Sequence, residues 1–110
     1  MKNRDYLILL ALADSDLHGL GVARGVQTLS EGRTVLWPAS LYGTLQELSS
    51  SGLIEELDDP RRRPADASEK KRFYRLTRAG FRALAVETDR LAALVKVAKS
   101  RLKPRAGGAR

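Results

Sequence analysis

Two groups of side chains in this sequence have the chemistry to bind a polyanion. Six basic residues stand at the two ends of a polar segment that contains two prolines. They are Arg61, Arg62, Arg63, Lys70, Lys71 and Arg72. Guanidinium and ammonium groups neutralise phosphates, and such binding weakens steeply with salt because bound counterions are released. Between Arg61 and Arg82, nine residues are basic and two are acidic, so this block carries a large excess of positive charge.

The second group consists of small and hydroxyl-bearing residues earlier in the chain. Its members are Pro38, Ala39, Ser40, Tyr42, Gly43 and Thr44. Short side chains allow a helix to approach base edges in the major groove, and hydroxyl groups can bond phosphate oxygens. No Arg or Lys occurs between Pro38 and Ser50, and Glu47 is acidic. We therefore expect recognition through hydroxyl and apolar contacts and through DNA shape, rather than through bidentate contacts to guanine.

A helix is predicted to carry the second group. Pro38 suits the first helical position, where its missing N–H removes no helical hydrogen bond. Leu41, Leu45 and Leu48 recur at four and three residues and form the inner stripe of this helix. Gly52 ends it. Ser40, Tyr42, Gly43 and Thr44 are then expected on the outside or the flanks.

A strand hairpin is predicted to carry the basic group. Strands over 53–57 and Lys71–Leu76 enclose the polar segment from Asp58 to Lys70. Helix, strand, basic loop and strand, in this order, indicate a winged helix-turn-helix, a fold that is mainly α with a small β-hairpin. In this fold the helix enters the major groove and the loop contacts the flanking DNA backbone.

The remaining elements complete one domain. A first helix is expected to run to Ala13 with Asn3 or Asp5 as its cap, and a second from Leu17 to Leu29. A short strand is expected over Arg33–Trp37. Thr77 is expected to cap a long last helix that ends at Leu102.

The long last helix carries a heptad-like seam. The residues assigned to it are Leu84, Thr88, Leu91, Leu94, Val95, Ala98 and Leu102. The seam fits either the core of the chain itself or an interface between two copies, and the first helices are too short to cover all of it. The interface is the favoured interpretation. The expected organisation is a DNA-binding domain over 1–76, a dimerisation helix over 77–102 and a disordered basic tail over 103–110.

The composition of the chain argues against several other functions. The chain of 110 residues has a net charge of +7 and no cysteine, which excludes disulfides and thiolate metal sites. Its longest apolar run, Tyr6–Ala13, is shorter than the ~20 residues of a membrane span. With His18 as the only histidine and no phosphate-binding glycine loop, no catalytic constellation is present, so we expect no enzyme, cofactor or metal. A cytoplasmic protein is expected.

Trp37 is the only tryptophan and directly precedes the predicted DNA-binding helix. A partly buried ring that packs against the start of this helix is the expected arrangement. A place in a ligand pocket is the alternative.

The sequence resembles the PadR family of bacterial transcriptional regulators over Ile8–Val26, Ser40–Glu56 and Lys71–Leu84. The Leu-His-Gly element, the Leu-Tyr-x-x-Leu-x-x-Leu helix, Gly-Leu-Ile and Tyr-x-Leu-Thr-x-x-Gly carry this resemblance together. It implies a homodimer that binds double-stranded DNA at a palindromic operator, most often as a repressor. It further implies the short subclass, with a single C-terminal helix that pairs the subunits. A small-molecule effector is left open.

Two other functions fit the same pattern. A winged domain can grip a partner protein with its helix, in which case DNA binding would be weak and insensitive to salt. A basic domain can also coat RNA or DNA through charge alone, in which case affinity would not depend on sequence.

Overall fold

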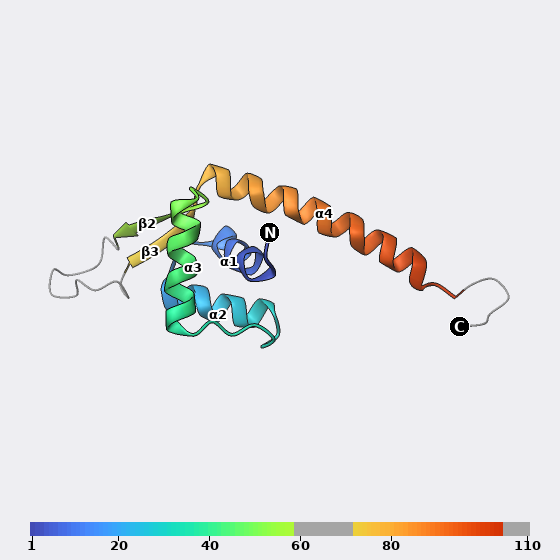
Figure 1. Ribbon diagram of the computed structural model, residues 1–110, viewed down its shortest axis with the longest axis horizontal. Helices are drawn as coiled ribbons and strands as arrows, with labels where there is room; N and C mark the ends of the chain where they lie inside the picture. Colours follow the sequence, from blue (N-terminus) through green and yellow to red (C-terminus); the bar gives the residue numbers. More distant parts are fainter. Residues whose placement is uncertain (59–71, 105–110) are drawn as a thin grey trace.

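The computed structural model describes residues 1–58 and 72–104 and confirms the winged-helix architecture predicted from the sequence. Three short helices pack together, a small sheet lies beside them, and one long helix extends away from this body (Figure 1). The elements are α1 (Asn3–Asp14), β1 (Leu17–His18), α2 (Gly19–Leu29), α3 (Pro38–Ser50), β2 (Ile54–Asp58), β3 (Arg72–Leu76) and α4 (Arg78–Leu102).

The core is built around α1, whose apolar residues occupy most of its circumference. A helix that is apolar nearly all round is stable only when other elements surround it. Accordingly Ile8 and Leu9 are fully buried, with side chains from every neighbouring element packed around them. The principal contributors are Val22 and Val26 of α2, Leu41 and Leu45 of α3, Ile54 of β2, Tyr74 and Leu76 of β3, and Leu84 of α4.

The sheet has three antiparallel strands in the order β1-β3-β2. The prediction that Leu17 begins the second helix is wrong, because Leu17 and His18 instead pair with Tyr74 and Phe73 of β3. The His18 and Phe73 rings reinforce this pairing, with their centres 4.0 Å apart. A strand of two residues is stable here only through a partner that is distant in the sequence.

Two other local predictions are also wrong. The segment over Arg33–Trp37 forms no strand; the N–H of Thr34 bonds the hydroxyl of Ser30 at 2.9 Å instead of a neighbouring strand. The first helix has Lys2, not Asn3 or Asp5, as its N-cap residue, and the Lys2 side chain makes no capping hydrogen bond.

The end of α3 follows the prediction closely. Gly52 adopts a positive φ of 77°, which a residue without a Cβ adopts readily. The N–H of Gly52 bonds the carbonyl of Ser49, and the N–H of Leu53 bonds the carbonyl of Leu48, both at 3.0 Å. This pair of bonds is the Schellman arrangement, which turns the chain from the helix directly into β2.

The start of α4 is joined to this turn through backbone contacts. Thr77 caps α4 as predicted, since its hydroxyl accepts a bond from the N–H of Gly80 at 3.0 Å. The same hydroxyl donates to the carbonyl of Gly52 at 2.6 Å, and the N–H of Thr77 bonds the carbonyl of Leu53 at 3.1 Å. Gly80 lies so near that an added Cβ would overlap the Leu53 carbonyl oxygen. We call this set of contacts the α3–α4 junction.

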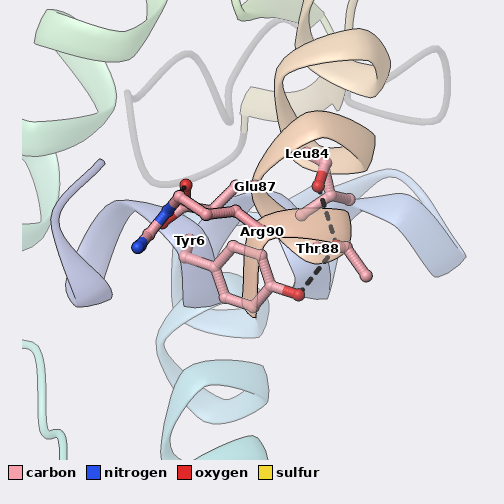
Figure 2. A network of polar contacts seen from close by, with 5 residues as sticks. All are labelled: Tyr6, Leu84, Glu87, Thr88 and Arg90. Carbon is pink, nitrogen blue, oxygen red and sulfur yellow. Dashed lines mark hydrogen bonds and ion pairs between the residues drawn. The ribbon is translucent and has the colours of Figure 1, made fainter. Parts of the chain in front are cut away.

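The first part of α4 then packs on α1 (Figure 2). Thr88 donates to the carbonyl of Leu84 at 2.7 Å, so its hydroxyl proton is committed, and the Tyr6 hydroxyl donates to Thr88 at 2.8 Å. Nearby, Arg90 forms two bonds to the carboxylate of Glu87, at 2.9 and 2.7 Å. Hydrogen bonding from Arg90 lowers the pKa of Glu87 below its ordinary value, so the ion pair persists in mildly acidic solution.

The seam predicted on α4 is therefore divided. Leu84 lies in the chain's own core with 6% of its surface exposed, so assigning it to a dimer interface is wrong. Leu91 is partly buried, whereas the apolar residues beyond it are not covered by the described residues: Leu94 and Val95 are each 52% exposed and Leu102 is 69% exposed. The helix packs on its own domain only near its start.

We expect Gly80→Ala to lower the free energy of unfolding by about 3 kcal/mol, because the added methyl group must displace a backbone carbonyl rather than a side chain. Urea denaturation followed by circular dichroism, at one fixed protein concentration, measures the loss. The matched control is Gly43→Ala, where nothing lies within 4 Å of the added Cβ. In this control the free energy of unfolding is expected to rise by about 1 kcal/mol, because Ala has a higher helix propensity than Gly. If the two substitutions changed the free energy of unfolding equally, the close approach of α4 to Leu53 at Gly80 would be contradicted.

Candidate nucleic-acid interface

The outer side of α3 presents the small residues singled out in the sequence. Pro38, Ala39, Ser40 and Gly43 are all exposed, while Leu41, on the opposite side, is buried. The side chain of the N-cap residue, Trp37, makes no capping hydrogen bond, and Pro38 has no N–H, so backbone amides of the first turn face outward without a helical partner. This surface can approach another molecule closely and favours an anion.

Thr44 does not belong to this surface. It is 3% exposed and lies on the same stripe as Leu41 and Leu48, so the expectation that it faces outward is wrong. Its spacing explains the burial, because residues three apart or four apart share one side of a helix. A hydroxyl in this position cannot reach a base edge without opening the core.

Tyr42 has a structural role that the sequence did not reveal. Its ring packs against Gly19 at the start of α2, where an added Cβ would come within 2.8 Å of the tyrosine oxygen. The tyrosine Oη is buried and has no hydrogen-bond partner among the described residues. In this arrangement the ring aligns α3 against α2, and the hydroxyl is not presented for a phosphate contact.

A polar groove separates α3 from the hairpin. Its volume is about 310 Å³. Its lining comprises Tyr42, Gly43, Gln46, Ser49, Glu56, Arg72 and Tyr74. Sequence reasoning missed Gln46, Ser49 and Glu56 as groove residues; only the position of Gln46 away from the leucine stripe gave a signal. Amide, hydroxyl and charged groups make this groove suited to hydrogen bonding rather than to an apolar ligand.

The stem of the hairpin is crossed by ion pairs. Arg72 bonds Glu56 at 2.7 Å and Arg75 bonds Glu55 at 2.6 Å. Exposed pairs of this kind contribute ~0–1 kcal/mol, so these two pairs add little to the stability of the hairpin. The other predicted wing residues, Arg61, Arg62, Arg63, Lys70 and Lys71, lie outside the described residues, as does most of the predicted basic tail.

Trp37 differs most from its expected environment. The ring is 70% exposed, so the prediction that it packs against the start of the helix is wrong. It lines neither the groove beside the hairpin nor a second, more apolar groove of about 410 Å³ between α1 and α2. Neither of these two grooves in the described part of the chain therefore includes Trp37.

Metal binding and membrane insertion have no counterpart in residues 1–58 and 72–104. Within these ranges, no three His, Cys, Asp or Glu side chains are grouped so that they could hold a metal ion. Nor is any helix of the described chain long and apolar enough to cross a membrane.

Comparison with known proteins identifies the family. The model of the transcriptional regulator PadR-like family matches residues 8–86, which include both α3 and the described strands of the hairpin. The chain belongs to this family. This is a family of transcriptional regulators, which are not enzymes.

Solved PadR-type structures share the fold along nearly the whole chain. A PadR family transcription regulator from Clostridium difficile is 22% identical, with a TM-score of 0.73 and coverage of 93% of this chain and 100% of that one. A PadR-like regulator from Bacillus cereus is 15% identical, with a TM-score of 0.73 and coverage of 92% of each chain.

One curated relative matches by sequence. An uncharacterized 37.1 kDa protein in transposon TN4556 of Streptomyces fradiae is 35% identical over 88 residues. The match takes in 80% of this chain but only 23% of that protein.

We expect Tyr42→Phe to raise the free energy of unfolding by about 1 kcal/mol, because it removes a buried hydroxyl that has no hydrogen-bond partner within residues 1–58 and 72–104. The same substitution at Tyr6, whose hydroxyl bonds Thr88, is the matched control and should lower stability by about 1 kcal/mol. Urea denaturation of both variants measures the difference. A loss of stability in Tyr42→Phe would show that its hydroxyl has a partner in the folded protein.

Proposed function

We propose that this PadR-like protein is a sequence-specific repressor that binds a palindromic operator as a homodimer. The observation that carries this proposal is the outer side of α3, where Pro38, Ala39, Ser40 and Gly43 are exposed in the first two turns. In helix-turn-helix proteins the N-terminal residues of this helix contact base edges, so they must be small or polar enough for close approach. A regulator of transcription works where the DNA is, which supports a cytoplasmic location.

Sequence readout in this proposal depends on few direct base contacts. The α3 sequence contains no Arg or Lys, and Glu47 on its exposed side repels phosphate and bonds only donors. Ser40 supplies a hydroxyl group, and Ala39 supplies a methyl group that fits beside a thymine methyl. Gln46, near the groove, is the residue of this helix best suited to adenine. Much of the specificity then arises from DNA shape and deformability.

The far half of α4 supports the dimer. Leu94, Val95 and Leu102 are more than half exposed, although their spacing and chemistry suit a packed seam. A second copy related by a twofold axis can cover them with the same surface. Two α3 helices then reach successive major grooves, roughly 34 Å apart. The family's regulators act as dimers, which agrees with this arrangement.

Titration of a fluorescently labelled duplex tests the proposal directly. The duplex is the DNA upstream of the protein's own gene, and binding is followed at two salt concentrations with scrambled DNA as competitor. Tight binding that resists the competitor supports the proposal. Equal loss to scrambled DNA would favour charge-driven coating, and weak binding that does not respond to salt would favour a protein partner.

The salt dependence of DNA binding measures how much the predicted wing, the basic loop between the two strands of the hairpin, contributes to affinity. Replacement of Arg61, Arg62 and Arg63 by Ala should reduce the slope of log affinity against log salt by up to about 2.7, since each phosphate contact contributes ~0.9. The control replaces Lys96, Lys99 and Arg101 of α4, which removes the same charge far from α3. A slope that changes equally in both variants would show that only net charge matters.

The seam on α4 has its own test. Val95→Glu should convert the dimer to monomer in sedimentation velocity, because an unpaired carboxylate would be buried at the interface. Operator affinity should fall about a hundredfold, because the two half-sites no longer act together. Ala93→Glu, about 200° away around the helix axis, is the control and should stay dimeric. A dimeric Val95→Glu would contradict the proposed interface.

A further inference from the structure

We propose that Trp37 is part of the DNA-binding surface and packs its indole ring against the duplex beside the first turn of α3. The proposal rests on the proposed DNA-binding function and adds a contact residue to it. Trp37 immediately precedes Pro38, and its carbonyl accepts the first helical bond of α3, from Leu41 at 2.8 Å. Trp37 is therefore exposed immediately beside the first turn of α3.

The ring is held in an exposed position by the residues before it. Leu36 is buried with 8% of its surface exposed, while its neighbours Val35 and Trp37 are 44% and 70% exposed. The loop between α2 and α3 is also held at Thr34, whose N–H donates a hydrogen bond to the hydroxyl of Ser30 at 2.9 Å. Burial of Leu36 thus anchors the backbone of this loop in the core directly before the exposed Trp37. A large aromatic side chain thus remains in water in the isolated chain.

The chemistry of indole suits the edge of a DNA groove. Its faces are apolar and can cover thymine methyl groups and deoxyribose carbons, while its single N–H can donate to a phosphate oxygen. Val35, Pro38 and Ala39, which lie close to Trp37 in the sequence, are exposed apolar residues as well, and exposed apolar patches are typical of binding surfaces. The absence of Arg and Lys from α3 leaves apolar contact as a main source of affinity at this end of the helix.

A second copy of the chain is a poorer occupant of this patch. The start of α3 lies beside α2, whereas α4 leaves the domain beside the opposite end of α3 (Figure 1). A dimer formed through the exposed half of α4 would leave Trp37 uncovered. The duplex is the partner that reaches the first turn of α3.

Trp37 is the only tryptophan, so its fluorescence reports on this site alone. We expect the acrylamide quenching constant of its emission to fall several-fold when the dimer is saturated with labelled operator duplex. Anisotropy of the DNA label measures saturation independently. Full saturation with unchanged quenching would overturn the proposal while leaving the proposed function intact, and absence of any DNA binding would overturn both. If protection from acrylamide quenching rose with protein concentration in the absence of DNA, Trp37 would lie at an interface between copies, and the proposal would be overturned.

Substitution provides a second measurement. Trp37→Ala should weaken operator binding roughly tenfold, and Trp37→Phe should retain most of the affinity. Both are expected to fold, because the side chain makes few contacts at 70% exposure. Phe81→Ala, which removes another exposed aromatic ring at the start of α4, is the matched control and should bind normally. Unchanged affinity in Trp37→Ala would overturn the proposal.

Discussion

The close backbone approach at the α3–α4 junction is the constraint on which the rest of this structure depends. Gly80 permits the first turn of α4 to lie directly against Leu53, and Thr77 bonds both Gly52 and Leu53. These contacts connect the end of one helix to the start of another through carbonyl groups, which cannot change rotamer as side chains do. The direction of α4 relative to α3 is therefore fixed by the backbone.

In the proposed function, this constraint connects DNA contact to subunit pairing. On one side of the junction α3 presents its first turn outward, and on the other α4 carries its exposed apolar residues away from the domain. The Tyr6–Thr88 bond fastens α4 to α1 a little further along. If two copies pair through the far half of α4, the separation of their α3 helices depends on these few contacts. An effector could change this separation only by binding one arrangement more tightly than the other.

The sequence predicted those features that depend on neighbours in the chain. Pro38, Gly52 and Thr77 mark helix ends through their own backbone or side-chain chemistry, and all three act as expected. Strand β1 was missed because its pairing with β3 is distant in the sequence. The orientation of Tyr42 likewise depends on Gly19 in another helix. By contrast, the burial of Thr44 was readable, since it lies three residues after Leu41 and four before Leu48.

The central claim is that two α3 helices on a paired molecule contact successive major grooves. Hydroxyl-radical footprinting on an operator duplex tests this most directly. We expect two protected stretches, related by a twofold axis and centred about 10 base pairs apart. A single protected stretch, or uniform protection with no twofold pattern, would contradict the claim.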